Sequence, residues 1–212
     1  YRSIVGSLVY AMTCTRPDLC WIVSKLSQYL NEPVTKKRWV IIKRVLRYIQ
    51  GTKNRKLMFK KSPISLVGYC DASWGGPPDR KSITGYAFAM SEGESNTGII
   101  SWKSRKQSTI ALSSCEAEYV SMAGAIQEGL FLRQLLFDID VNFDDVPSFV
   151  VYCDNQGAIA LAQKAQVSER SKHFDVKYHF IRNHVSDGNV QLKYLPTNEM
   201  MADCFTKPLG KL

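Results

Sequence analysis

The hydrophobic pattern of this chain changes its period near residue 63, and that change limits the folds open to it. Apolar residues recur every three or four positions in the first part, which predicts three helices, over 1–12, 15–30 and 35–51. Thr15 is placed to cap the second of these helices, and Gly51 to end the third. After Pro63, three apolar runs separated by turn-rich linkers predict an antiparallel meander of strands, at 66–71, 82–90 and 99–104.

The rest of the chain alternates helical and strand patterns. A long helical stretch over 113–139 precedes a strand, two helices, a strand and a short helix, at 148–154, 155–164, 170–188, 190–196 and 198–207. This order favours an α/β domain with one mixed five-stranded sheet and helices on its faces. Right-handed crossovers would bring the fourth strand beside the first.

The charge is divided between the same two parts. Residues 1–60 hold 13 Lys and Arg against 2 Asp and Glu, a net charge of +11, and residues 61–212 hold 15 against 17, a net charge of −2. A basic segment favours a polyanionic partner such as nucleic acid, although a solvated helical face explains the same charge. On the third predicted helix, a basic stripe that can follow phosphates is formed by Lys36, Lys43 and Arg47. The apolar side of that helix holds Trp39, Ile42, Val45, Leu46 and Ile49.

The six cysteines form no C-x-x-C pair, which disfavours a zinc site of that kind. The sequence shows neither an apolar run long enough for a membrane span nor a signal-peptide pattern. We therefore expect free thiols in a reducing, intracellular compartment and no secretion. The chain begins within a helix-like pattern, which suggests a fragment of a longer polypeptide.

Two apolar segments end in the same three residues, Tyr-Cys-Asp, which places Asp71 and Asp154 at strand ends. Glu118, early in the long helix, and Asp203, in the last one, also have apolar flanks. Gathered carboxylates repel unless cations bind, and two Mg²⁺ or Mn²⁺ ions held this way can assist phosphodiester hydrolysis. Each acid also has an ordinary explanation, since Asp154 could cap a helix, Asp71 shape a turn, and the other two be exposed. The pattern alone leaves both interpretations open.

Eight motifs, in this order along nearly the whole chain, resemble the end of the Pol polyprotein of Ty1/copia-type LTR retrotransposons: YRSIVGSLVYAMTCTRPDL, VLRYIQGT, GYCDASWGG, DRKSITGY, SWKSRKQSTIALSSCEAEY, YCDNQGAI, SKHFDVKYHFIR and MADCFTKPL. The resemblance implies a ribonuclease H domain over residues 64–212, with the ribonuclease H-like mixed sheet. It also implies that residues 1–60 are the C-terminal, thumb-like part of a reverse transcriptase. No Y-x-D-D motif is present in the chain, so we expect no polymerase activity from it.

The resemblance also implies a D-E-D-D set that is both catalytic and ligand to two Mg²⁺ (or Mn²⁺) ions, namely Asp71, Glu118, Asp154 and Asp203. The stretch AEYVSMA selects Glu118 over Glu116, which lies about 200° away on a helix. Gln156 matches a position that contacts the hybrid near its 2′-hydroxyls. Further residues placed to line the hybrid are Trp74, Lys103, Arg105, Lys106, Ser113 and Ser114, although Trp74 and Trp102 could equally be core residues.

The implied activity is metal-dependent endonucleolytic hydrolysis of the RNA strand of an RNA–DNA hybrid during retrotransposon reverse transcription. The upstream polymerase part of the same polyprotein is an implied partner, and the oligomeric state is left open. The implied location is intracellular, in a cytoplasmic virus-like particle or the nucleus. Two alternatives are a catalytically inactive binding or tether domain of a decayed element, and a transposase or integrase. The intact D-E-D-D set argues against the first, and the DNQ motif with the thumb-like segment against the second.

One departure from the family pattern concerns histidine. Many cellular ribonucleases H carry a His in the loop before the last helix, but here that loop is PTNEMM. The three histidines lie on the preceding helix instead. There we expect His173 and His184 at the surface and His179 packed.

Overall fold

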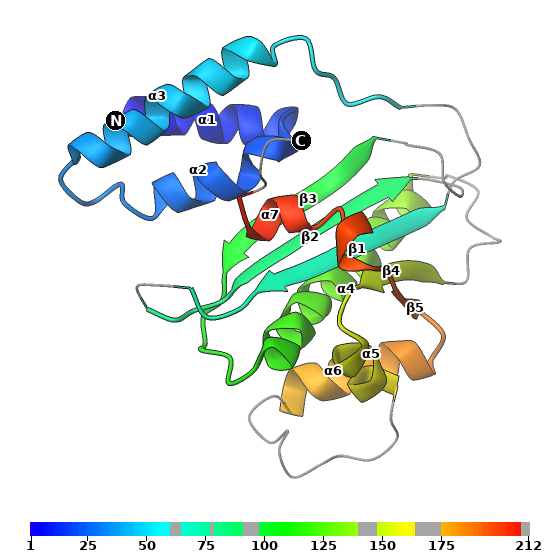
Figure 1. Ribbon diagram of the computed structural model, residues 1–212. Coiled ribbons are helices and arrows are strands. Elements are labelled where there is room, and N and C mark those ends of the chain that lie inside the picture. Colours follow the sequence, from blue (N-terminus) through cyan, green and yellow to red (C-terminus); the bar gives the residue numbers. More distant parts are fainter. Residues whose placement is uncertain (60–64, 77–78, 91–97, 140–147, 164–174, 209–212) are drawn as a thin grey trace. The chain divides into compact units, whose positions relative to one another are not determined.

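The chain divides into two compact units, Tyr1–Met58 and Phe59–Leu212. The computed structural model describes residues 1–59, 65–76, 79–90, 98–139, 148–163 and 175–208. In the first unit, helix α1 (Arg2–Cys14) is followed by a 3₁₀ turn (Pro17–Leu19), α2 (Cys20–Ser27) and α3 (Lys36–Gly51) (Figure 1). This unit has its own apolar core, formed by Val5, Leu8, Leu19, Val23, Leu26, Ile42 and Val45.

The helix ends of the first unit correct one prediction. Thr35 caps α3, because its Oγ1 accepts a hydrogen bond from the Arg38 backbone N–H at 3.3 Å. Thr15 does not cap the second helix, since Pro17 opens a 3₁₀ turn and α2 begins only at Cys20; it is instead the C-cap residue of α1. The apolar side predicted for α3 is also only partly buried: Ile42 and Val45 lie in the core, whereas Trp39 and Leu46 are 39% and 44% exposed.

The second unit is built on a five-stranded sheet with the order β3-β2-β1-β4-β5. The strands are β1 (Leu66–Ser73), β2 (Ile83–Met90), β3 (Ile99–Lys106), β4 (Phe149–Cys153) and β5 (Val190–Tyr194). The first three pair antiparallel, and β4 and β5 continue the sheet in parallel with β1. The predicted mixed sheet, its meander and the place of the fourth strand beside the first are confirmed.

The parallel pairing of β1 with β4 puts the two Tyr-Cys-Asp segments in register. Tyr69 lies opposite Tyr152, with the rings stacked 5.5 Å apart, and Cys70 lies opposite Cys153. Both cysteines are fully buried, as expected for strand residues that face the packed side of the sheet. Strand β1 continues to Ser73, two residues beyond its predicted end.

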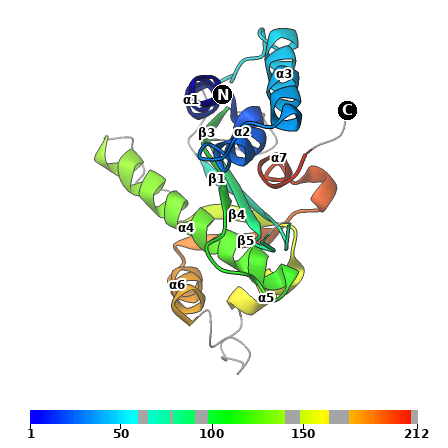
Figure 2. The ribbon, with the colours of Figure 1, turned by 90° about the vertical axis from the view of Figure 1, so that its left-hand side faces the viewer.

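Helices cover both faces of this sheet. Figures 1 and 2 show α4 (Ser114–Asp138), α5 (Gln156–Gln163) and α6 (Asp175–Ser186) on one face, and the short α7 (Asp203–Thr206) on the other. The core between α4, α6 and the sheet includes Phe88, Met122, Ile126, Phe149, Tyr178 and Ile181. Among the described residues, no helix combines the length and hydrophobicity needed to cross a bilayer.

The C-terminal helices differ in detail from their prediction. The last one is split into a 3₁₀ turn (Thr197–Glu199) and α7, because Met200 has an extended backbone conformation. The described part of the preceding helix begins at Asp175, so the prediction for His173 lies outside the described residues. His179 is exposed, not packed in the core as predicted, with its ring edge-on to that of the buried Tyr178, and His184 is half-buried, with its ring centroid 4.7 Å from that of Phe180.

Two glycines of α4 offer a test of how tightly this helix packs on the sheet. A Cβ added at Gly129 would lie 2.3 Å from Cε2 of the buried Phe149 ring, whereas the nearest atom to one at Gly124 would be Tyr86 Cε1, at an ordinary contact distance of 3.6 Å. We expect Gly129→Ala to lower the free energy of unfolding by about 1–3 kcal/mol through overpacking. Gly124→Ala, the matched control, should raise it by up to about 1 kcal/mol through helix propensity. Urea denaturation followed by circular dichroism measures both, and equal stabilities would contradict this packing.

Candidate active site

Three aspartates from distant parts of the chain meet at the carboxyl-terminal ends of β1 and β4. Asp71 lies within β1, Asp154 follows β4, and Asp203 is the first residue of α7. Each offers a carboxylate oxygen, and these oxygens all lie within 4.8 Å of one another. Asp71 is only 3% exposed, so this member of the cluster is buried.

The approach of α7 to the sheet depends on a glycine. Gly85 of β2 lies opposite Asp71 of β1. A Cβ at Gly85 would lie 2.6 Å from Thr206 Cγ2 and 2.8 Å from Phe205 Cβ. Because position 85 has no side chain, α7 packs directly on β2, and the Thr206 hydroxyl donates a hydrogen bond to Asp71 Oδ2. The same contact brings Asp203 to Asp71.

Glu118 reaches this region from the first turns of α4, on the other face of the sheet. Its side chain is 5% exposed, and Oε1 accepts a hydrogen bond from the Ala72 backbone N–H at 3.1 Å. Oε2 lies 4.0 Å from Cys153 Sγ. Burial, followed by the neighbouring Cys153, Asp71 and Asp154, raises the pKa of Glu118 from 4.5 to about 10. Glu118 is therefore protonated near neutral pH in the metal-free protein.

Glu116, the other glutamate of SSCEAEY, has a local role. Its backbone N–H donates to Ser113 Oγ at 3.1 Å, and its Oε2 accepts from the Leu112 backbone N–H at 2.8 Å. These two bonds satisfy donors at the start of α4 in the manner of a capping box. Glu118, and not Glu116, lies beside the aspartates.

The four acids do not have the ordinary roles of helix cap, turn residue or exposed helix residue that the sequence left open for them. Asn155 caps α5, since its Oδ1 accepts from the Ala158 backbone N–H at 2.9 Å, and this leaves Asp154 without that role. Asp154 instead accepts a hydrogen bond from Thr197 Oγ1 at 2.7 Å. Asp71 forms no turn, because β1 continues past it. Neither Glu118 nor Asp203 is an exposed helix residue.

A lysine offsets part of the charge of this cluster. Lys207 Nζ lies 2.8 Å from Asp203 Oδ1, one helical turn away. Burial lowers the pKa of Lys207, but the hydrogen bond to Asp203 and the charges of Asp71 and Asp154 outweigh it, so its pKa is raised overall. Burial raises the pKa of Asp71, as do the charges of Asp203 and Asp154, against the Thr206 hydrogen bond and the Lys207 charge. A divalent cation would relieve this repulsion more completely, and the three-carboxylate donor set suits Mg²⁺ or Mn²⁺.

Several of the predicted nucleic-acid contacts lie exposed near the ends of the elements that carry the acids. Trp74 follows β1 and is 52% exposed, with its Nε1 donating to the Ala111 carbonyl oxygen at 3.0 Å. Ser113 and Ser114 are exposed at the start of α4, and Gln156 is exposed at the start of α5. The exposure of Trp74 excludes the core interpretation for this residue.

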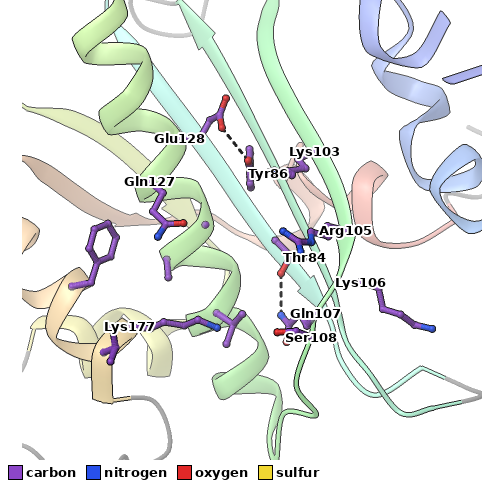
Figure 3. A pocket seen from close by; sticks show the side chains of 15 residues that line it. Thr84, Tyr86, Lys103, Arg105, Lys106, Gln107, Ser108, Gln127, Glu128 and Lys177 are labelled. Carbon is purple, nitrogen blue, oxygen red and sulfur yellow. Dashed lines mark hydrogen bonds between the residues drawn. The ribbon is translucent and has the colours of Figure 1, made fainter. Parts of the chain in front are cut away.

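The three basic residues predicted on β3 are divided between the two faces of the sheet. On β3, Lys103 lies opposite Tyr86 and Arg105 lies opposite Thr84. Both partners are neighbours of Gly85, which lies opposite Asp71. Because side chains alternate along a strand, Lys103 and Arg105 point to the α4 face of the sheet, away from Asp71. There they line a pocket of about 410 Å³. Figure 3 shows Arg105 extending toward α4, whereas Lys106 extends away from it. The Lys106 ammonium pairs with Asp79 at 2.8 Å.

The first unit holds the remaining predicted contacts. Lys36, Lys43 and Arg47 are all exposed on α3. They lie along about three helical turns on one side of the helix, next to the exposed Trp39. A basic stripe beside an exposed aromatic ring is suited to a phosphate backbone.

Sequence reasoning missed four residues that shape the site: Gly85, Thr197, Thr206 and Lys207. Thr206 and Lys207 belong to the motif MADCFTKPL, but their bonds to Asp71 and Asp203 depend on α7 crossing β2. Thr197 lies in the PTNEMM loop, where no local pattern distinguishes it. Only Lys207 carries a local signal, because it lies four residues after Asp203 on a predicted helix.

The chain is similar to retrotransposon polyproteins along its whole length. It is 42% identical over 208 residues to the "Retrovirus-related Pol polyprotein from transposon TNT 1-94" of Nicotiana tabacum, and 40% identical over 214 residues to that from transposon RE2 of Arabidopsis thaliana. These alignments cover 98% and 100% of the chain, but the chain spans only 15% and 14% of the two polyproteins. No family model matches the sequence.

Solved structures show the same fold. A foamy viral protease-reverse transcriptase ("dRH") in complex with double-stranded DNA matches 92% of this chain and 31% of its own, with a TM-score of 0.56 and 13% identity. A foamy viral protease-reverse transcriptase in complex with an RNA/DNA hybrid matches 100% and 26%, with a TM-score of 0.50 and 9% identity. At these identities the likeness concerns the fold alone. The predicted ribonuclease H-like fold is confirmed.

The raised pKa of Glu118 predicts how stability depends on pH. The folded chain keeps a proton that the unfolded chain releases above about pH 4.5, so stability falls as the pH rises from there toward about 10. The loss is at most about 1.4 kcal/mol per pH unit for this group. Glu118→Gln should flatten that decline between about pH 6 and about pH 8 in chelator-treated protein, measured by urea unfolding. Glu116→Gln should keep the wild-type slope, and a wild-type slope in Glu118→Gln would contradict the assignment.

Proposed function

Because the chain belongs to the Ty1/copia-type retrotransposon Pol polyproteins, we propose that it acts, inside the cell, as the ribonuclease H of such a polyprotein, hydrolysing the RNA strand of RNA–DNA hybrids. The observation that carries this proposal is the meeting of Asp71, Asp154 and Asp203 within 4.8 Å at the strand ends of a ribonuclease H-like sheet. A group of carboxylates with Glu118 beside it is costly to folding, and bound cations explain why it is kept.

The cations in this proposal are two Mg²⁺ or Mn²⁺ ions, held by Asp71, Asp154 and Asp203, with Glu118 as the fourth ligand after it loses its proton. Such ions activate a water and stabilise the leaving oxygen in phosphodiester hydrolysis. The products would carry a 3′-hydroxyl and a 5′-phosphate.

The protein's own groups orient these ligands. The Thr206 hydroxyl fixes one oxygen of Asp71, the Thr197 hydroxyl fixes one oxygen of Asp154, and the Ala72 N–H holds one oxygen of Glu118. Each carboxylate therefore presents its other oxygen in a defined direction. Thr197 also gives the PTNEMM loop a role that needs no histidine.

Recognition of the hybrid is assigned to the exposed polar groups near the site. Gln156, Ser113 and Ser114 offer donors and acceptors that suit 2′-hydroxyls and phosphates, and the exposed Trp74 offers a flat apolar surface. These groups read the sugar and the shape of the duplex, so cleavage should depend little on base sequence.

The first unit, Tyr1–Met58, is proposed to be the thumb-like end of the reverse transcriptase, joined in the polyprotein to the upstream polymerase. Lys36, Lys43 and Arg47 would hold the backbone of the same hybrid. The support for this role is the exposed basic stripe and the similarity along the whole chain.

Cleavage of a labelled RNA–DNA hybrid in Mg²⁺ tests the proposal. Asp71→Asn removes a charged ligand from the centre of the cluster, and we expect the rate to fall by roughly 100-fold or more. Asp187→Asn, an exposed carboxylate at the end of α6, is the matched control and should cleave at the wild-type rate. No cleavage by the wild-type chain, or equal rates for Asp71→Asn and Asp187→Asn, would favour an inactive binding domain.

The salt dependence of hybrid binding tests the role of α3. Replacing Lys36, Lys43 and Arg47 by Gln should reduce the slope of log affinity against log salt by about 2–3, since each lost phosphate contact contributes about 0.7–0.9. Fluorescence anisotropy at several salt concentrations measures the slope for the full chain carrying Asp71→Asn, so that the hybrid stays intact. An unchanged slope would make the basic stripe a solvated surface.

A further inference from the structure

We propose that the pocket on the α4 face of the sheet binds a nucleoside phosphate, a role separate from the hydrolysis of hybrids. The pocket has a volume of about 410 Å³ and is lined mainly by residues of β2, β3, α4 and α6. That volume lies within the range of about 300–1,000 Å³ that is usual for small organic ligands. The pocket and α7 lie on opposite faces of the sheet, so the proposal does not rest on the nuclease function.

The pocket exists because α4 presents small residues to it. Ala123 and Gly124 lie in the middle of its α4 wall, between Val120 and Glu128. At 1.5 Å per residue, these two outer positions are about 12 Å apart along the helix. A Cβ added at Gly124 would approach no atom more closely than Tyr86 Cε1 at 3.6 Å. An elongated ligand can therefore lie along the helix.

One end of the pocket is basic. Figure 3 shows Lys177 extending from α6 toward α4 at the end far from Glu128, and Arg105 extending toward α4 from β3. Within the described part of the chain, no carboxylate forms an ion pair with either side chain. The half-buried Thr84 adds a hydroxyl that can donate a hydrogen bond. Two cations and a hydroxyl donor are suited to a phosphate group.

Gln107 lines the same end and is only 6% exposed. Its Nε2 donates hydrogen bonds to Thr84 Oγ1 at 3.0 Å and to the Ala117 carbonyl oxygen at 2.9 Å. Because a carbonyl oxygen only accepts, the second bond fixes the orientation of the amide. Gln107 Oε1 then has no hydrogen-bond partner among the described residues, which is unusual for a buried polar atom. A ribose hydroxyl beside it would supply the missing donor.

The other end of the pocket carries a fixed carboxylate. The Tyr86 hydroxyl donates to Glu128 Oε2 at 3.1 Å, and the Ser101 hydroxyl donates to Oε1 at 2.6 Å. Each oxygen can accept a further hydrogen bond, which suits the amino group of a nucleobase. Val120 and Phe180 add apolar surface for the ring. A nucleic-acid strand would bring a second phosphate toward Glu128, so the charges favour a ligand that is anionic at one end only.

Isothermal titration calorimetry of the full chain with ADP tests the site, in EDTA so that no divalent cation links ADP to the acidic cluster. We expect one equivalent to bind, at least about 10-fold more tightly than inorganic phosphate, because the apolar walls contact the base. Arg105→Gln and Lys177→Gln should each weaken ADP binding by roughly 10-fold or more. Lys106→Gln is the matched control and should bind as the wild type does, because its ammonium pairs with Asp79 and extends away from α4.

Gly124→Leu places a side chain in the pocket. It should abolish ADP binding but leave cleavage of the hybrid in Mg²⁺ at the wild-type rate, which separates failure of this proposal from failure of the nuclease proposal. Four results would overturn the site: no binding of ADP, equal affinity for inorganic phosphate, equal loss in Lys106→Gln, or binding retained by folded Gly124→Leu. Weaker hybrid binding by Arg105→Gln, without any binding of ADP, would overturn it in favour of a nucleic-acid strand. Circular dichroism confirms that each variant is folded.

Discussion

The parallel pairing of β1 with β4 is the constraint on which the rest of the site depends. Its register sets Cys70 opposite Cys153, and so places Asp71 and Asp154 at one end of the sheet. A slip of one residue would turn Asp71 to the α4 face, into the hydrophobic core. The stacked Tyr69 and Tyr152 rings and the fully buried cysteines favour the observed register on both faces. The repeated Tyr-Cys-Asp segment therefore aligns the two strands and also supplies two of the aspartates.

Two other elements close on this pair from opposite sides. The missing side chain at Gly85 lets α7 lie on β2, and Glu118 comes from α4 to the end of the same two strands. The result is an arrangement of acids that destabilises the metal-free fold, because burial and mutual repulsion raise the pKa of Asp71 and of Glu118. Natural proteins retain such costs where a ligand offsets them.

Most of the fold follows from the sequence, because its periods of two and 3.6 residues are clear between Leu66 and Ser186 and the crossover rule orders the strands. The resemblance to the family, through the stretch AEYVSMA, selects Glu118 over Glu116, and helix geometry adds that the two glutamates cannot face the same cation. The hydrogen-bond partners of the acids could not be predicted from these sequence patterns. The bonds from Thr197 and Thr206 span 43 and 135 residues, and no local pattern encodes them. That Lys103 and Arg105 lie on the opposite face of the sheet from Asp71 follows only from the strand register.

Lys207 gives the cluster a property that the carboxylates alone would lack. Its ammonium sits against Asp203 and shares the field of Asp71 and Asp154, so the metal-free site already holds a cation. A polyanionic ligand that approached bare carboxylates would be repelled, and this repulsion is weakened by one unit of charge. A divalent cation that bound to these carboxylates would enter a site whose negative charge Lys207 already offsets in part.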